Sequence, residues 1–130
     1  MQSHPEQAVR AMLEAERHPG PSLVIAHSPC IAHGYDLVQS PHQQRRTVDS
    51  GLWPLYRFDP QRVDQGETPL MLDSGAPTLD VADAMAAEGR FRMVELRDPD
   101  RYRQLLQAAR DAVRQRQALD EQLSHIHLPP

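Results

Sequence analysis

The sequence contains one cysteine, no lysine and no long hydrophobic run. A single cysteine, Cys30, excludes an internal disulfide bond and leaves one thiol to be packed, reactive or metal-bound. All 14 basic residues are arginine and the formal net charge is −4, so no excess positive charge is available for nucleic acid. No apolar run approaches the roughly 20 residues that cross a bilayer, and no basic segment precedes an apolar one at the N-terminus. We therefore expect a cytoplasmic protein with no nucleic-acid and no membrane partner.

What is present suits about one small domain. The 130 residues are 39% hydrophobic and 25% charged, a composition that supports a core and argues against extended disorder. Twelve prolines predict short elements with irregular connections.

The first third of the chain has the pattern of half an α/β unit. Ser3 is placed to cap a helix that Gly20-Pro21 ends. Residues 22–27 (SLVIAH) are an apolar, β-branched run that predicts a buried strand. Residues 28–34 follow at the carboxyl end of this strand, which is the edge where open α/β sheets bind ligands.

The middle of the chain predicts a helix and an extended segment. Ser40 has the pattern of a cap for a helix that reaches about Ser50. Residues 53–58 are predicted to be extended and partly buried, in an edge position because of Pro54. Residues 59–77, which are rich in proline and glycine, predict a long ordered loop or wrapping arm.

The C-terminal part is predicted to be helical. Thr78 is a candidate cap for a helix through Glu88, with Gly89 at its end. Asp98 and Pro99 predict the start of the clearest helix, which is expected to reach about Ser124. The apolar stripe of that helix consists of Tyr102, Leu105, Leu106, Ala109, Val113, Leu123 and Ile126.

One cluster of chemically active residues stands out by its spacing. His27, Cys30 and His33 are three residues apart, a separation that lets loop ligands meet one metal ion such as Zn²⁺. The competing interpretation makes Cys30 a small buried hydrophobe and the histidines surface residues. A Cys-His nucleophile pair is a third possibility, which requires a lowered thiol pKa.

Three other motifs have simpler explanations. Residues 73–75 (Asp-Ser-Gly) lack the glycine-rich context of a phosphate loop and predict a turn. The aromatic cluster at 53–58 is better explained by packing than by base stacking. Arg45-Arg46 is typical of solvated surface, with docking to an acidic partner as the alternative.

Several stretches resemble a known family. Residues 20–36 (GPSLVIAHSPCIAHGYD), then Gln43-Gln44 and residues 48–60 (VDSGLWPLYRFDP), closely resemble pyruvate:ferredoxin (flavodoxin) oxidoreductase. The resemblance continues through residues 69–74 (PLMLDS), Arg90-Phe91 and the terminal helix, so that it covers roughly residues 3–126. It points to the C-terminal part of the thiamine-diphosphate-binding domain of that enzyme.

The resemblance implies an oxidoreductase. The family oxidatively decarboxylates pyruvate with coenzyme A to acetyl-CoA and CO₂. It passes electrons through [4Fe-4S] clusters to ferredoxin or flavodoxin, and it is dimeric. The family enzyme is about ten times longer than this chain, beyond the size of a single domain. Its Gly-Asp-Gly and asparagine elements, which hold Mg²⁺ and thiamine diphosphate, lie upstream, and this chain has no Gly-Asp-Gly.

One functional position carries over by resemblance. In the family, the [4Fe-4S] cluster nearest the thiamine has a fourth ligand that is distant in the chain, and Cys30 occupies that position. Such a cluster needs about four thiolates. This implication favours Cys30 as a metal ligand over inert packing, and it displaces the zinc interpretation of His27 and His33. His27 stands where the family often has tyrosine.

The resulting expectation is an incomplete α/β piece of a thiamine-diphosphate-binding domain followed by a mostly helical region. Its parts are residues 1–58 (α/β part), 59–77 (loop or arm) and 78–130 (helical extension). An internal start, a broken gene or a truncated gene model would explain Met1, which falls within the domain. The chain alone is expected to be inactive, and to expose an apolar edge that aggregates or docks on the remainder of the enzyme. The alternatives are a non-enzymatic α/β interaction module and a small zinc-binding protein.

Overall fold

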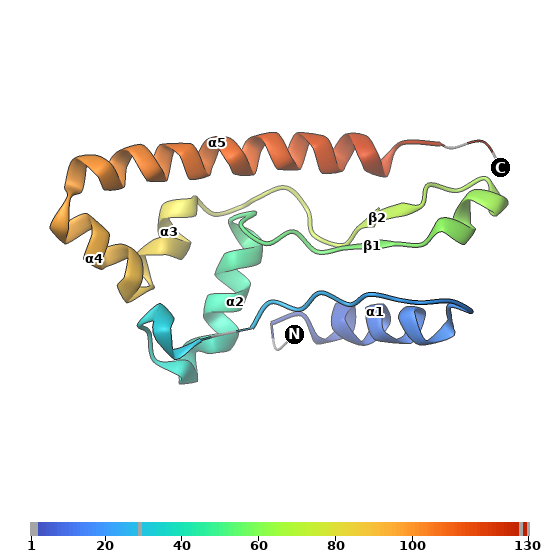
Figure 1. Cartoon of the computed structure of the whole chain (residues 1–130), viewed down its shortest axis with the longest axis horizontal. Helices are drawn as coiled ribbons and strands as arrows, with labels where there is room; N and C mark the ends of the chain where they lie inside the picture. The colour runs from blue at the N-terminus through green and yellow to red at the C-terminus, as the bar shows by residue number, and fades with distance from the viewer. Residues whose placement is uncertain (1–2, 29, 128, 130) are drawn as a thin grey trace.

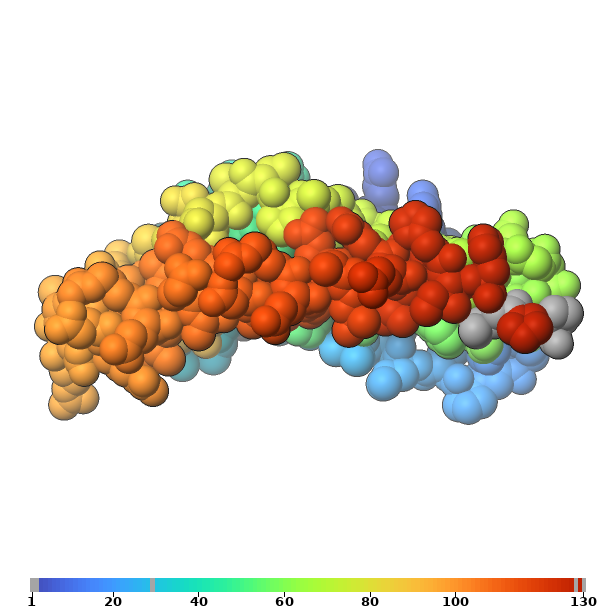
Figure 2. Space-filling model, turned by 90° about the horizontal axis from the view of Figure 1, so that it is seen from above, coloured from blue at the N-terminus to red at the C-terminus, as the bar shows by residue number. Residues whose placement is uncertain are grey.

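The computed structural model describes residues 3–28, 30–127 and 129. Met1 and Pro29, which the sequence analysis used, lie outside the described residues. The molecule is elongated, with the long C-terminal helix along one side, a two-stranded ribbon beneath it and the first helix on the opposite side (Figure 1). Seen from above, the long helix runs along most of the length of the molecule (Figure 2).

The elements are mostly helices. In chain order they are α1 (Pro5–Arg17), the 3-10 helices η1 (Ile31–His33) and η2 (Leu37–Gln39), α2 (Ser40–Asp49), β1 (Tyr56–Phe58), the 3-10 helix η3 (Pro60–Gln65), β2 (Leu70–Leu72), α3 (Val81–Ala86), α4 (Gly89–Arg97) and α5 (Pro99–Ser124). The result is a small, helix-rich mixed domain with a two-stranded sheet, which is compatible with the predicted α/β class.

The sheet is an antiparallel pair of short strands. Tyr56 pairs with Leu72, and Phe58 with Leu70. β2 lies within residues 59–77, where the sequence predicts a loop or arm, because the prolines and glycines on either side hide its three apolar residues. The predicted extended segment at 53–58 contains β1, in an edge position as expected.

The core lies between α3 and α5. Its buried members are Val81, Met85, Tyr102 and Val113, and Leu52, Phe91, Leu106 and Ala109 pack against them. The apolar stripe predicted for the terminal helix is therefore confirmed in its first half. Leu105 is an exception in this half, at 42% exposed. Leu123 and Ile126 are 40% and 41% exposed because they lie past this cluster, Ile126 beyond the end of α5.

The start and end of α5 follow the sequence closely. The Asp98 carboxylate accepts a hydrogen bond from the Arg101 amide, and Pro99 opens the helix. Both features and the end at Ser124 confirm the prediction. The reason is that an N-cap and a first-turn proline act locally and need no tertiary partner.

The predicted caps of the other helices are wrong in detail. His4 precedes α1 without a side-chain cap, and the Ser3 hydroxyl lies 2.9 Å from the His4 Nδ1 atom. Ser40 is the first residue of α2 and donates back to the Leu37 carbonyl. Asp80 rather than Thr78 caps α3.

The end of α3 also differs from the prediction. α3 ends at Ala86, and Gly89 begins α4 instead of closing the preceding helix. Glycine is strongly enriched just past a helix end, but Gly89 is needed here for the close approach of the Gly34 backbone.

The predicted buried strand at residues 22–27 is not formed. This segment runs as a stretched, irregular chain beside α1 (Figure 1). Leu23 is 84% exposed, Ile25 65% and Val24 48%. Within the part of the chain that the structure describes, the sheet contains β1 and β2 alone, so these residues have no neighbouring strand there to supply a ladder. The segment thus exposes apolar side chains, but it does not form the edge of a sheet.

Helices of the described residues include none that is both long and apolar enough to span a membrane.

Candidate functional site

Cys30 lies on an exposed turn between the stretched segment and α2. It is the residue before η1, and its carbonyl accepts a hydrogen bond of 3.0 Å from the His33 amide. The Gly34 amide donates to the Ile31 carbonyl, and Gly34 closes the turn at φ 74°, a left-handed conformation that favours glycine. The thiol is exposed, so it is accessible to a group held by another polypeptide.

The turn is fixed against the junction of α3 and α4. The Gly89 amide donates a 3.1 Å hydrogen bond to the Gly34 carbonyl, which joins residues 55 positions apart. A Cβ atom on Gly89 would lie 2.8 Å from that carbonyl oxygen, and one on Gly34 would lie 3.1 Å from the Gly89 Cα. The two backbones therefore approach as closely as glycines allow.

Glu88, the residue before Gly89, is the polar centre of this junction. It is only 5% exposed. Its carboxylate accepts hydrogen bonds from Gln43 Nε2 at 2.9 Å and from Arg90 Nε at 2.6 Å, and lies 4.0 Å from His33 Nδ1. Gln43 Nε2 also donates to the Ala84 carbonyl. A buried carboxylate that is paired in this way links α2, α3, α4 and the Cys30 turn.

His27 and His33 are directed to different neighbours. The His27 ring lies 5.3 Å from the Trp53 ring, whereas His33 lies near Tyr35 and Glu88. Partial burial lowers the pKa of His27, helped by the charge of His33 and opposed by that of Glu88. Within residues 3–28, 30–127 and 129, no three His, Cys, Asp or Glu side chains gather as a metal group. The structure thus does not bring the predicted zinc trio together.

The Asp73 region is structural. The Asp73 carboxylate accepts hydrogen bonds from the Arg57 guanidinium at 2.8 Å and from Gln7 at 3.0 Å, and Arg57 also pairs with Glu14. The Ser74 hydroxyl accepts from the Leu55 amide. These contacts tie α1 to the two-stranded sheet, so residues 73–75 serve the fold rather than a phosphate.

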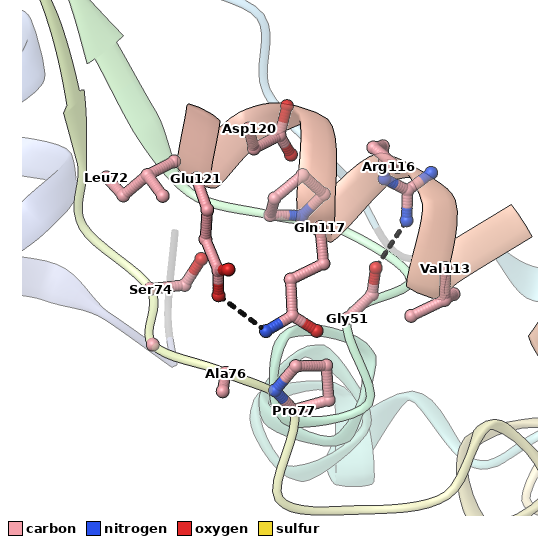
Figure 3. A pocket seen from close by; sticks show the side chains of 12 residues that line it. Gly51, Leu72, Ser74, Ala76, Pro77, Val113, Arg116, Gln117, Asp120 and Glu121 are labelled. Atoms are coloured by element: carbon pink, nitrogen blue, oxygen red, sulfur yellow. Dashed lines mark hydrogen bonds between the residues drawn. The ribbon is translucent and has the colours of Figure 1, made fainter. Parts of the chain in front are cut away.

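A small pocket of about 130 Å³ lies between α5 and the segment after β2 (Figure 3). Several of its polar side chains already bond within the protein. Arg116 donates to the Gly51 carbonyl, and Gln117 to Glu121. Asp120 and Glu121 add negative charge, which disfavours an anionic ligand.

Sequence reasoning singled out Cys30 as a candidate but did not find the residues that fix its turn. Glu88 and Gly89 lie more than 50 residues away in the chain, and the sequence indicated only a helix end for them, with no link to Cys30. The available signal was the pair Arg90-Phe91, which belongs to the family resemblance and directly follows this junction.

Comparisons with known proteins agree with that resemblance. No family model matches the chain. It is 49% identical over 120 residues to a pyruvate-flavodoxin oxidoreductase of Rhodospirillum rubrum, which covers 92% of this chain and 10% of the relative. It is 50% identical over 99 residues to a probable pyruvate-flavodoxin oxidoreductase of Escherichia coli, covering 76% of the chain and 8% of the relative.

A third relative is named for ferredoxin instead of flavodoxin. The chain is 38% identical over 103 residues to a pyruvate:ferredoxin oxidoreductase of Moorella thermoacetica, covering 79% of the chain and 9% of that protein. The chain thus spans about a tenth or less of the length of these relatives. Over most of its length, it is similar to one short segment of pyruvate-flavodoxin and pyruvate:ferredoxin oxidoreductases.

Proposed function

We propose that this chain is a segment of a pyruvate:ferredoxin/flavodoxin oxidoreductase, from the C-terminal part of its thiamine-diphosphate-binding domain. The observation that carries the proposal is 49% identity along 92% of the chain to a relative of which it spans only 10%. Such a segment works as part of the larger protein. The complete enzyme decarboxylates pyruvate oxidatively with coenzyme A and transfers electrons to ferredoxin or flavodoxin.

Within this enzyme, Cys30 supplies one thiolate to a [4Fe-4S] cluster. A cluster of this kind takes four cysteine ligands and relays single electrons. The chain has one cysteine, so the other ligands belong to the remainder of the enzyme. The exposed thiol on a hydrogen-bonded turn suits a ligand that meets a cluster held from outside. Thiamine diphosphate and Mg²⁺ have no fitting motif here, and their site belongs to the remainder.

The apolar segment at residues 22–27 is the contact with that remainder. Leu23, Val24 and Ile25 follow one another, so they point to both faces of an extended chain, and all three are exposed. A strand that is apolar on both faces is typical of parallel sheets covered by helices. We infer that strands of the remaining domain flank this segment. Cys30 would then follow the carboxyl end of a strand inside the completed sheet.

The same reasoning extends to activity and context. The chain alone is catalytically inactive because it holds one cluster ligand and no thiamine diphosphate motif. Its partners are the remainder of the oxidoreductase and, through it, ferredoxin or flavodoxin, in a homodimeric cytoplasmic enzyme.

Co-expression tests this proposal. The chain is produced alone and together with the remaining part of a homologous enzyme. Iron–sulfur clusters are then reconstituted anaerobically with iron and sulfide. We expect pyruvate-dependent electron transfer only in the combination. Cys30→Ala should lower the iron content and abolish turnover, whereas the matched surface change Val38→Ala, at a residue 78% exposed, should leave both intact. Unchanged iron content and turnover in Cys30→Ala would rule out the ligand assignment.

The exposed apolar segment also favours a second candidate, an interaction module without enzymatic function. This candidate predicts that the chain binds the remainder while neither the cluster nor turnover depends on Cys30. The same co-expression experiment separates the two, since binding is scored by co-purification and the cluster by its absorption spectrum.

A further inference from the structure

The turn that carries Cys30 is held at one end by backbone contacts of unusual closeness. The Cys30 carbonyl bonds to the His33 amide and the Ile31 carbonyl to the Gly34 amide. The position of Cys30 is therefore coupled to that of Gly34 through one tight turn. Gly34 in turn receives the 3.1 Å hydrogen bond from Gly89. Whatever holds Gly34 consequently restrains the thiol four residues earlier.

Gly89 is required by space rather than by backbone conformation. A Cβ atom there would lie 2.8 Å from the Gly34 carbonyl oxygen, closer than ordinary packing permits. The backbone of Gly89 is helical, as the first residue of α4, so alanine would fit it and would even favour the helix. Any loosening caused by alanine must then come from the lost approach to Gly34.

Glu88 supplies the second attachment. Its buried carboxylate lies 4.0 Å from His33 Nδ1, inside the same turn, and is held by Gln43 and Arg90. Gln43 comes from α2, which follows the Cys30 turn in the chain. The C-terminal side of the turn is thus held by the Gly89–Gly34 backbone contact and by the Glu88 side chain.

We propose that Glu88 and Gly89 form a clamp that positions the Cys30 thiol. They are positioning residues, since they act through His33 and Gly34. The clamp itself rests only on the contacts of this chain. Its role toward a cluster rests on the proposed function, and the experiment separates the two.

The test uses the single cysteine as a reporter. A nitroxide label on Cys30 of the full 130-residue chain reports the mobility of the turn in its electron paramagnetic resonance line shape. Gly89→Ala should increase this mobility and speed hydrogen exchange of the residue 89 amide about tenfold. Gly75→Ala is the matched control, because a Cβ at Gly75 meets no atom within 4 Å. Circular dichroism confirms that both variants keep the wild-type helix content.

Glu88 provides a second, independent variant. Glu88→Ala removes the carboxylate and with it the contacts to Gln43, Arg90 and His33. It should therefore also increase the mobility of the label. Glu88→Gln keeps the shape and one acceptor oxygen, so its effect should be intermediate. An unchanged line shape and unchanged exchange in both Gly89→Ala and Glu88→Ala would overturn the clamp, whatever the role of Cys30.

In the complete enzyme, the midpoint potential of the cluster distinguishes a positioning role of Glu88 and Gly89 from a purely structural one. If Cys30 ligates the cluster, Gly89→Ala should shift the midpoint potential of that cluster at unchanged iron content, because the geometry around a ligated sulfur tunes the potential. A mobile label with an unshifted potential would support the clamp and count against the ligand assignment.

Discussion

The two ends of this molecule bury their apolar residues very differently. The C-terminal part, in which α3 packs on α5, encloses Val81, Met85, Tyr102 and Val113. Among the described residues from 4 to 39, none is buried, although α1 and the segment after it carry Val9, Met12, Leu13, Leu23, Val24 and Ile25. These six side chains are between 43% and 84% exposed.

This contrast does not come from composition, since both parts are rich in apolar residues. α3 and α5 find their apolar partners within the chain, although Met93 and Leu96 of α4 stay exposed. The N-terminal part has the apolar pattern of a core element and is held to the rest by polar groups, chiefly Arg57 with Glu14 and Asp73. We infer that the N-terminal part is built to be covered by another polypeptide.

The largest expected effect tests the core directly. Met85→Ala should lower the free energy of unfolding by about 2–4 kcal/mol, because it leaves a cavity in a small cluster. Ile25→Ala, which removes a comparable apolar group from an exposed site, should change it by less than about 0.5 kcal/mol. Urea unfolding followed by circular dichroism measures both. Equal losses would show that residues 22–27 are packed in solution and would remove the contrast.

The parts of the fold that the sequence predicts correctly are those with local causes. Asp98 and Pro99 mark the start of α5, and the range of α2 follows its flanking residues. Residues 22–27 were misjudged for the opposite reason. Their composition favours a strand, but a strand also needs neighbours, and the two-stranded sheet of the described residues does not pair with them.

In the candidate site, too, features with local causes were predictable from the sequence and long-range contacts were not. Cys30 was found from its loop context and family resemblance, which are visible along the chain. Its attachment to Glu88 and Gly89 depends on how α3 and α4 pack, and a 55-residue separation leaves no periodicity to detect. β2 was missed because three residues between Pro69 and Asp73 are too few to produce a recognisable alternation.

The next effect concerns the close packing of the C-terminal part. Gly51 has φ 72°, and a Cβ there would lie 2.7 Å from Pro77 and 2.8 Å from Val113. Gly51→Ala should therefore cost about 1–3 kcal/mol in unfolding free energy. Gly66 has a similar φ of 73° but open space around it, so Gly66→Ala should cost about 1 kcal/mol from conformation alone. Thermal or urea unfolding of the pair separates crowding from backbone conformation, and equal costs would exclude crowding.

A smaller effect, dependent on pH, tests the polar attachment of α1. Burial disfavours the charge of Asp73, but hydrogen bonds from Arg57 and Gln7 and the Arg57 charge outweigh it and hold its pKa below the ordinary value. A carboxylate with a lowered pKa stabilises the fold above the unfolded pKa of about 3.9, and this contribution is lost as pH falls through the lower folded pKa.

Asp73→Asn should therefore cost about 1–2 kcal/mol of unfolding free energy at neutral pH. The difference from wild type should shrink below about pH 4. Asp64→Asn, at an exposed residue of η3, is the control and should have little effect at any pH. Urea unfolding between pH 3 and pH 7 gives the measurement. A pH-independent difference would assign the loss to packing rather than to the charge.

The smallest effect on stability is expected at the exposed segment itself, where the consequence is instead self-association. Ile25→Asp places a charge on a side chain that is 65% exposed, so the unfolding free energy should change by less than about 0.5 kcal/mol. The wild-type chain should associate with increasing concentration through its uncovered apolar surface, and Ile25→Asp should shift it toward monomer in sedimentation velocity. Leu96→Asp, at a residue 79% exposed on α4, is the matched control and should leave association unchanged. A wild-type chain that stays monomeric at all concentrations would contradict the idea that the N-terminal part awaits a covering partner, because its exposed leucine, valine and isoleucine would then be tolerated as ordinary surface.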